Sequence, residues 1–223
     1  MISAVSSWSG GKDSCFAFYK ARQDGYRIEH LLNFVTKGDG RCCFHGIDAG
    51  LVRLQAMLIG VPVIQKEVSR DMKDYEHIFR QALAELTASG IRSMVFGDIY
   101  LLDNVNWIER LCKEAGVKPI EPLWDVPPLR IAEEFIESGF KALIISCRDG
   151  ILGKDFIGRY IDKEILKEFE ARKICPCGEN GEFHTLVVDG PIFKQSIKIL
   201  ESEVILKDGF WKHWFLDIKK YGR

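Results

Sequence analysis

A short run of small and charged residues near the N-terminus has the composition of a phosphate-binding loop. Ser9-Gly-Gly-Lys-Asp-Ser14 directly follows a strand-like segment, Ser3–Trp8, and opens a helix-like segment, Asp13–Asp24. Backbone N–H groups and the positive end of a helix point toward an anion placed there. Two glycines let the chain approach an oxyanion closely, Lys12 adds a positive charge, and the two serines add hydroxyl donors. The run, which we call the phosphate loop, therefore predicts a cradle for phosphate groups.

The phosphate loop departs from the Walker A pattern in two places. That pattern requires a glycine where this chain has Ser6 and a serine or threonine where it has Asp13. A carboxylate inside an anion cradle is costly unless a metal accompanies it, so Asp13 predicts Mg²⁺ held together with the phosphates. The alternative is a glycine-rich turn with a surface lysine, which we consider far weaker because motif and context agree.

A second candidate position follows a buried strand. Gly97-Asp98 comes directly after Ser93–Phe96, and open α/β sheets bind their ligands at the carboxyl ends of their strands. Asp98 is therefore a candidate Mg²⁺ or substrate residue. Helix capping or hydrogen bonding within the loop is the equally weighted alternative.

A third candidate lies late in the chain, where Gly178-Glu-Asn-Gly-Glu182 places two carboxylates on a flexible loop. Glu179 and Glu182 could act as a general base or bind a cationic group, or could belong to an ordinary solvated turn. His184 and Thr185 follow on an emerging strand as candidate substrate contacts. For His184, a hydrogen-bonded structural role is an equal alternative.

Composition excludes several classes of protein. The 223 residues are 47% hydrophobic, and 31 Lys and Arg nearly balance 32 Asp and Glu, so no overall positive field favours nucleic acid or acidic membranes. Seven scattered cysteines are not a disulfide framework. Neither Cys175-x-Cys177 nor Cys42-Cys43 with His45 has the second ligand pair of a zinc site, so the thiols are expected to be buried or incidental. Without a signal sequence or a membrane span, we expect a cytoplasmic protein.

The first half of the chain alternates strand-length apolar runs with helix-period segments. This alternation predicts a doubly wound parallel sheet of the α/β class, covered by helices on both faces. Further strands are expected at Ile28–Val35, Val61–Ile64 and Ser93–Phe96, and helices after Asp48, over Asp71–Ser89 and over Asn106–Ala115.

The second half reads as a smaller α+β domain with antiparallel strands. Four prolines between Pro119 and Pro128 mark a composition shift, and we expect domains at 1–121 and 122–223. Helices are expected at Leu129–Ser138 and Lys163–Arg172, and strands at Lys141–Cys147, Thr185–Val188, Ser196–Leu200, Val204–Lys207 and Trp211–Lys219. Asp208-Gly209 is a hairpin signal between the last two. Trp107, Trp124, Trp211 and Trp214 are expected to fill core or interdomain surface.

With these motifs the chain resembles the PP-loop ATP pyrophosphatases, and among them the diphthine–ammonia ligase family. The resemblance covers almost the whole chain, and its most specific part is the late Gly-Glu-Asn-Gly-Glu-Phe-His-Thr run. The other matching motifs are Ser9–Ser14, His45-Gly46, Gln55-Ala56, Gly60-Val-Pro62, Phe96-Gly-Asp-Ile99, Pro122-Leu-Trp124, Cys175-Pro-Cys177 and Asp189-Gly-Pro191. It implies an adenine nucleotide α-hydrolase-like first domain of the HUP type.

The resemblance also implies a reaction. A substrate carboxylate would attack the α phosphate of ATP, giving an acyl-adenylate and pyrophosphate, and ammonia would then displace AMP. Lys12, Asp13, Glu179 and Glu182 would be the catalytic residues, and Asp13 and Asp98 the Mg²⁺ ligands. ATP would contact Ser7, Trp8, Ser9, Gly10, Gly11, Lys12, Asp13, Ser14, Phe34 and Gly97. Glu179, Glu182, His184 and Thr185 would contact the substrate.

The family's acceptor is diphthine on elongation factor 2, and with no glutaminase domain visible the nitrogen source would be ammonium. Relatives in organisms without diphthamide would use another acceptor. Two rivals remain: a tRNA-thiolating enzyme, which would need catalytic cysteines and a basic RNA surface, and a non-catalytic nucleotide-binding module. The exposed edges of the C-terminal strands could pair two chains as a homodimer, or could equally be blunted.

Overall fold

The computed structural model describes residues 1–208 and 212–223, and these form two compact units. The first unit comprises Met1–Ser9 and Asp13–Asp125, and the second comprises Gly10–Lys12 and Val126–Arg223. The expected division into domains at 1–121 and 122–223 stays a prediction. The centre of the phosphate loop thus clusters with the C-terminal half of the chain.

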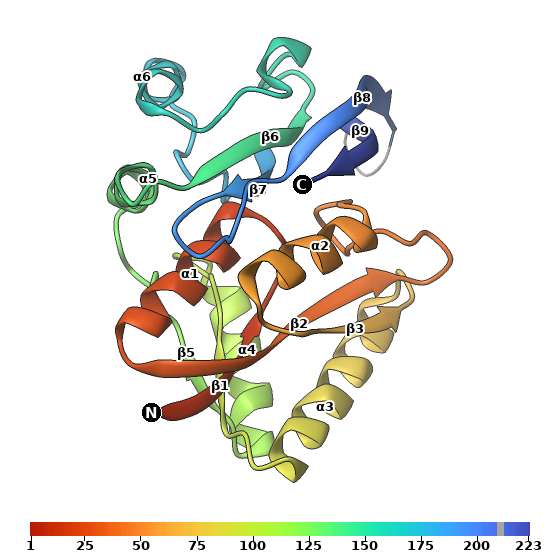
Figure 1. The fold of residues 1–223 in the computed structure, drawn as a ribbon, viewed down its shortest axis with the longest axis vertical. Helices are drawn as coiled ribbons and strands as arrows, with labels where there is room; N and C mark the ends of the chain where they lie inside the picture. The colour runs from red at the N-terminus through yellow and green to blue at the C-terminus, as the bar shows by residue number, and fades with distance from the viewer. Residues whose placement is uncertain (209–211) are drawn as a thin grey trace. The chain divides into compact units, whose positions relative to one another are not determined.

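The first unit contains a five-stranded sheet with the order β3-β2-β1-β4-β5, and all neighbouring strands are parallel. The strands are β1 (Ile2–Ser7), β2 (Tyr26–Thr36), β3 (Val63–Val68), β4 (Ser93–Val95) and β5 (Lys118–Ile120). The helices are α1 (Lys12–Gln23), α2 (Ala49–Ile59), α3 (Met72–Ala88) and α4 (Leu102–Ala115). Right-handed crossovers place α1 and α2 on one face and α3 and α4 on the other (Figure 1). The predicted doubly wound parallel sheet is confirmed.

The core under α3 and α4 follows from the spacing of apolar residues in these helices. Asp71 caps α3 by accepting a hydrogen bond from the Lys73 N–H at 2.9 Å. One face of α3 then buries Phe79, Ala82, Leu83 and Leu86. These side chains join Val5, Leu32, Phe34, Met94, Ile108 and Leu111 in one hydrophobic cluster. The cluster holds the carboxyl ends of β1, β2 and β4 in place.

Two strands of the first unit differ from the expectation. β3 begins at Val63 rather than Val61 and extends to Val68, because its register follows the length of β2. β5 was not expected, since Pro119 lies at its centre. A proline is tolerated there because β5 is an edge strand with only β4 as its neighbour.

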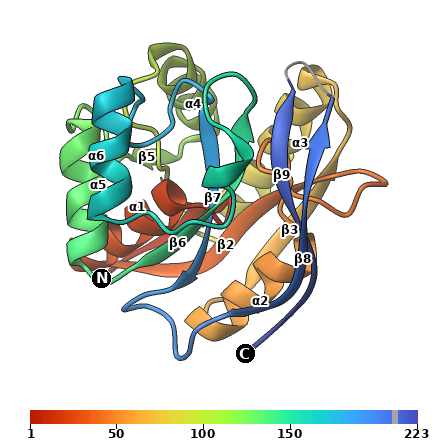
Figure 2. The same cartoon turned by 90° about the horizontal axis from the view of Figure 1, so that it is seen from above.

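The second unit contains a four-stranded antiparallel sheet with the order β7-β6-β9-β8 (Figure 2). Its elements are α5 (Pro128–Glu137), β6 (Lys141–Arg148), the 3₁₀ turn η1 (Lys154–Phe156), α6 (Lys163–Arg172), β7 (Phe183–Asp189), β8 (Lys198–Lys207) and β9 (His213–Gly222). α5 and α6 pack against one another. The expected antiparallel strands of this half are confirmed.

The two strands expected at Ser196–Leu200 and Val204–Lys207 are one continuous strand, β8. Pairing with β9 carries the chain through the polar residues Glu201 to Glu203, with irregular register between Ile199 and Ser202. Tertiary pairing therefore overrides the polar break that the sequence shows. The expected hairpin residue Gly209 and Trp211 lie outside the described residues.

Replacing Asp48 tests the expected cap of α2. Its Oδ1 accepts a hydrogen bond from the Leu51 N–H at 3.2 Å, and Gly60 ends the helix in the left-handed conformation. Asp48→Ala should lower the free energy of unfolding by about 1 kcal/mol, whereas Asp48→Asn should keep most of it. Urea denaturation of the three proteins measures the difference, and equal stability of the alanine variant and the wild type would contradict it.

Candidate functional site

In the first unit, the phosphate loop leaves the carboxyl end of β1 and is tightened by its two serines. The Ser9 N–H lies 3.3 Å from Ser14 Oγ, and the two hydroxyl oxygens are 3.1 Å apart. Gly97 lies against the same turn, since a Cβ at this position would be 2.8 Å from the Asp13 carbonyl carbon and 2.9 Å from the Ser14 nitrogen. A side chain at position 97 would therefore collide with the backbone of the phosphate loop. The structure gives Gly97 the role of a packing partner of the loop backbone.

In the second unit, the centre of the phosphate loop is bonded to β7. The Val187 N–H donates to the Gly10 carbonyl at 3.0 Å, and the Lys12 N–H donates to Thr185 Oγ1 at 3.0 Å. The Lys12 ammonium donates to the Cys177 carbonyl and lies 5.4 Å from the centre of the Phe183 ring. Within the second unit, Gly10–Lys12 and the run 175–187 thus form one bonded arrangement, which the sequence motifs alone did not show.

Carboxylates gather at the carboxyl edge of the parallel sheet. Burial raises the pKa of Asp98, the Asp13 charge raises it further, and a hydrogen bond from Asn104 opposes them. Burial also raises the pKa of Glu121, followed by the charges of Asp98 and Glu109. One Glu121 carboxylate oxygen is buried with no hydrogen-bond partner among the described residues. Glu121 follows β5 directly, and because that edge strand was not expected, this residue was missed.

These carboxylates fit a Mg²⁺ ion that arrives with a nucleotide. Mg²⁺ usually takes one or two protein carboxylates and fills its other positions with phosphate oxygens and water. Asp13 lies close enough to Asp98 for its charge to raise the pKa of Asp98, and the Glu121 oxygen without a partner among the described residues adds negative potential. Within residues 1–208 and 212–223, no three Asp, Glu, His or Cys side chains form a closed metal site. The nucleotide would therefore have to supply ligands.

The loop between Cys175 and Glu182 is organised by Glu182, whose side chain is only 6% exposed. Its Oε1 accepts from the Cys175 N–H at 3.2 Å and from Asn180 Nδ2 at 3.1 Å, and its Oε2 accepts from the Asn180 N–H at 2.9 Å. A buried carboxylate is stable only with such donors. Glu182 therefore does not lie in a solvated turn. Its side chain instead holds the loop through these hydrogen bonds. Glu179, next to Asn180, is partly exposed.

His184 lies on β7 opposite Ser146. Burial lowers its pKa to about 4, and the positive charges of His213 and Lys12 add to the effect. The imidazole is therefore neutral at neutral pH and carries one donor and one acceptor nitrogen. Its neighbour Thr185 is buried and contacts the loop.

Three further residues expected to contact ATP are Trp8, Phe34 and Ser7. Trp8 is buried, its Nε1–H donates to Gln55 Oε1 at 3.0 Å, and its ring lies 5.6 Å from Phe18. Phe34 is in the core, 4.8 Å from Tyr75. Ser7 ends β1 and is partly exposed. The roles of Trp8, Phe34 and Ser7 toward adenine stay predictions, and the first two side chains also serve packing.

The cysteines are free thiols, and burial disfavours the thiolate form of five of them. Burial raises the pKa of Cys42 to about 11 and the pKa of Cys112 and Cys147 to about 12. It also raises the pKa of Cys15 and Cys43. Since the thiolate is the reactive form, these five residues are poor nucleophiles.

A parallel sheet with a Gly-Gly-Lys-Asp turn after its first strand defines an α/β protein with a glycine-rich loop at the carboxyl edge of the sheet. Family comparison narrows this class. Residues 2–119 match the model of the diphthamide synthase N-terminal domain, and residues 127–223 match the model of the diphthamide synthase C-terminal domain. The chain belongs to the diphthamide synthase family.

Curated relatives agree with this assignment. The chain is 26% identical to the diphthine–ammonia ligase of Schizosaccharomyces pombe over 88% of its own length, but spans only 36% of that relative. It is 24% identical to the mouse and human diphthine–ammonia ligases over 89% of its length and spans 83% of each. Among solved structures, one described as a predicted subunit of tRNA methyltransferase from Methanocaldococcus jannaschii is 16% identical and aligns with a TM-score of 0.49, covering 86% of this chain and 98% of that one.

Thr185 provides a test of the bonded loop. Thr185→Val removes the acceptor of the buried Lys12 N–H, which should lower the free energy of unfolding by about 1–2 kcal/mol. If the bond also positions the loop, the KM for ATP should rise by about tenfold, equivalent to 1.4 kcal/mol. Thr185→Ser keeps the oxygen and should change neither value. An unchanged KM in a folded Thr185→Val protein would show that the bond does not position the loop.

The low pKa of His184 predicts acid sensitivity. In the unfolded chain this residue takes up a proton near 6.5, whereas in the folded protein it does so only near 4. The unfolded state therefore binds more protons between these values, and stability falls as the pH drops from about 6.5 toward 4. His184→Gln should flatten this part of the stability curve. Imidazole proton NMR should show one histidine that remains neutral at pH 5, and full protonation of every histidine there would contradict the prediction.

Proposed function

We propose that this chain is an ATP-dependent amide ligase of the diphthine–ammonia ligase type, forming an amide from a carboxylate acceptor and ammonia with release of AMP and pyrophosphate. Membership of the diphthamide synthase family and the names of the curated relatives support it. The observation that carries it is the bonding of Lys12 to Thr185 and Cys177. This bonding joins Lys12, at the centre of the phosphate loop, to the run 175–185. The proposed reaction assigns roles to both motifs.

In the first step, an oxygen of the acceptor carboxylate attacks the α phosphorus, and the bond to the leaving pyrophosphate breaks. Negative charge gathers on the pyrophosphate, where the N-terminus of α1 and Lys12 can stabilise it. The Lys12 ammonium has three N–H donors, so it can keep its bond to the Cys177 carbonyl and donate to a phosphate oxygen. A Mg²⁺ ion held by Asp13 and Asp98 would neutralise phosphate charge.

In the second step, the ammonia nitrogen attacks the acyl carbon of the adenylate, and AMP leaves. The ammonium ion must first lose a proton, and the partly exposed Glu179 is the candidate base. Glu182 supports this role because its carboxylate accepts hydrogen bonds from the Cys175 and Asn180 N–H groups, which lie on either side of Glu179 in the loop. The neutral imidazole of His184 is suited to donate or accept one hydrogen bond at the acceptor.

The surroundings of the thiols favour the ligase over tRNA thiolation. Sulfur transfer requires an accessible thiolate, and burial raises the pKa of Cys42 and Cys43, the adjacent pair. The near balance of acidic and basic residues also gives no general basis for RNA binding. No helix in the described part of the chain has the length and apolar character needed to cross a membrane, and a cytoplasmic location remains our expectation.

Product analysis tests the reaction. The protein incubated with ATP, Mg²⁺, ammonium and elongation factor 2 carrying diphthine should release AMP and pyrophosphate in equal amounts and convert the acid to the amide, read by mass spectrometry. Lys12→Met should lose the activity by at least about a hundredfold, as expected for removal of a transition-state charge partner. ADP and phosphate as products would contradict the mechanism. Amidation of a different carboxylate acceptor would support the proposed reaction but show that the substrate is not diphthine.

A further inference from the structure

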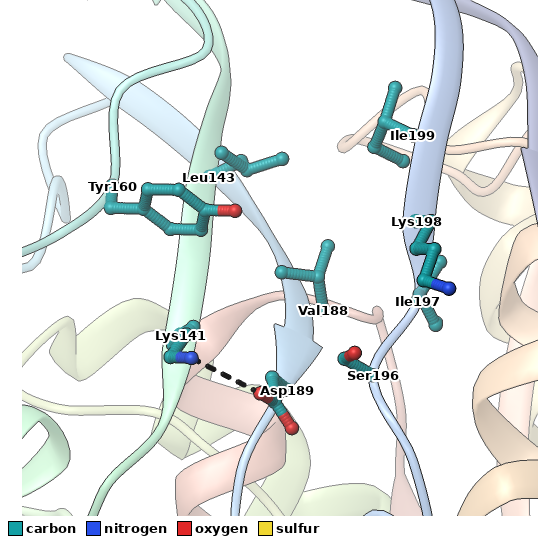
Figure 3. A pocket seen from close by; sticks show the side chains of 9 residues that line it. All are labelled: Lys141, Leu143, Tyr160, Val188, Asp189, Ser196, Ile197, Lys198 and Ile199. Carbon is teal, nitrogen blue, oxygen red and sulfur yellow. Dashed lines mark ion pairs between the residues drawn. The ribbon is translucent and has the colours of Figure 1, made fainter. Parts of the chain in front are cut away.

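The second unit contains a pocket of about 340 Å³ that the proposed reaction does not use. It lies beside the start of β6 and the end of β7, and the segment 196–199, which leads into β8, forms its opposite wall (Figure 3). Its volume lies at the lower end of the range for small-molecule sites. The site therefore suits a ligand of a few carbon atoms.

Irregular strand pairing creates the pocket. β9 pairs with β6 only from Ser146 to Arg148, so the first half of β6 has no strand of the hairpin beside it. The segment 158–161 takes that place, with the Ile144 N–H donating to the Arg159 carbonyl and the Ile161 N–H donating to the Ala142 carbonyl, both at 2.9 Å. Tyr160 is thereby set opposite Leu143. On the other side, the Ile197 N–H donates to the Val188 carbonyl at 2.7 Å.

The turn that follows β7 fixes one end of the pocket. Asp189 Oδ1 accepts from the Gly190 N–H at 2.9 Å, and its Oδ2 lies 3.4 Å from the Lys141 ammonium. A Cβ at position 190 would lie 2.2 Å from the Phe140 ring, so only glycine fits this turn. The Asp189-Gly190 motif, to which the proposed reaction assigns no role, thus orients one ion pair at the rim.

The lining combines an apolar floor with polar groups that lack partners. Leu143, Val188 and Ile197 are at most 7% exposed and line the pocket. Among the described residues, the hydroxyl groups of Tyr160 and Ser196 and the ammonium of Lys198 have no hydrogen-bond or ion-pair partner. Figure 3 shows the Tyr160 hydroxyl directed toward the wall that carries Ile197 and Ile199. In Figure 3 the Lys198 ammonium lies on the side of its strand away from Tyr160, and rotation about the torsions of its four-carbon stem can bring it over the mouth.

We propose that this pocket binds a carboxylate carried on a short, branched apolar stem. The two lysines and Asp189 leave one net positive charge, which matches one carboxylate better than a doubly charged phosphate. Lys198, Tyr160 and Ser196 offer donors for the two carboxylate oxygens. Leu143, Val188 and Ile197 offer the stem apolar contacts at the floor of the pocket. This binding is separate from the proposed ligase reaction.

Ligand-observed NMR with the full-length protein tests the proposal. The probes are 4-methylpentanoate and its uncharged amide, 4-methylpentanamide. The acid should bind and the amide should bind at least about tenfold more weakly, the loss expected for one charge-assisted hydrogen bond. Lys198→Glu should weaken acid binding about tenfold and Tyr160→Phe about threefold. Lys194→Glu, which changes an exposed lysine outside the lining, should leave it unchanged.

A second arm identifies the source of the carboxylate. An acetylated peptide ending in leucine with a free C-terminus is compared with the same peptide amidated at its C-terminus. Tighter binding of the free peptide than of 4-methylpentanoate assigns the pocket to a protein C-terminus, and equal or weaker binding assigns it to a free small acid. Equal binding of each acid and its amide would overturn the proposal, as would equal effects of Lys198→Glu and Lys194→Glu. Both lysines are exposed, and thermal unfolding verifies that each variant is folded.

Discussion

Lys12 makes the bonds on which the candidate site depends. Its backbone N–H is held by the Thr185 hydroxyl and its ammonium by the Cys177 carbonyl, while the side chain is 3% exposed. A buried ammonium is costly without such acceptors. These hydrogen bonds tie Gly10–Lys12 to the second unit, while their neighbours in sequence belong to the first. Within the second unit, Lys12 is thereby tied to the run that carries the two glutamates.

The carboxylates of this protein show two outcomes of burial. Glu182 is surrounded by donors from its own loop and holds that loop in one conformation. Asp98 and Glu121 have neighbouring acidic charges, and burial raises the pKa of each. Asp98 is also hydrogen-bonded to Asn104, whereas one oxygen of Glu121 is buried without a partner among the described residues. Buried carboxylates with a raised pKa near like charges are typical of functional sites. The contrast supports a positioning role for Glu182 and the proposed Mg²⁺ role of Asp98.

Glycines mark the points where the backbone must come close to another chain segment. Gly97 permits contact with the backbone of the phosphate loop, and Gly178 lies where a Cβ would be 2.8 Å from the Phe183 carbonyl oxygen. Gly97 meets a segment that is distant in sequence, whereas Gly178 meets a residue that follows closely in the same loop and strand. The matching motifs of the family thus contain glycines for packing around the site as well as for the cradle itself.

The periodicity of the sequence predicted most of the first unit, because a parallel sheet covered on both faces needs continuous apolar strands separated by amphipathic helices. It failed at β5, where Pro119 is tolerated at an edge, and at β8, where pairing with β9 continues through Glu201 to Glu203. Such short or polar strands are defined by their neighbours, which a local pattern does not contain.

The sequence by itself determined the phosphate loop, the parallel sheet that presents it and the chemical types of the candidate residues, because these depend on local spacing. Only the tertiary structure decided which groups these residues contact. Thr185 bonds to Lys12 across 173 positions of the chain, Glu182 turns inward, and Glu121 joins Asp98 at the sheet edge. Hydrogen-bond partners and burial depend on segments that folding brings together from far apart, so neither can be read from the residues on either side of a motif.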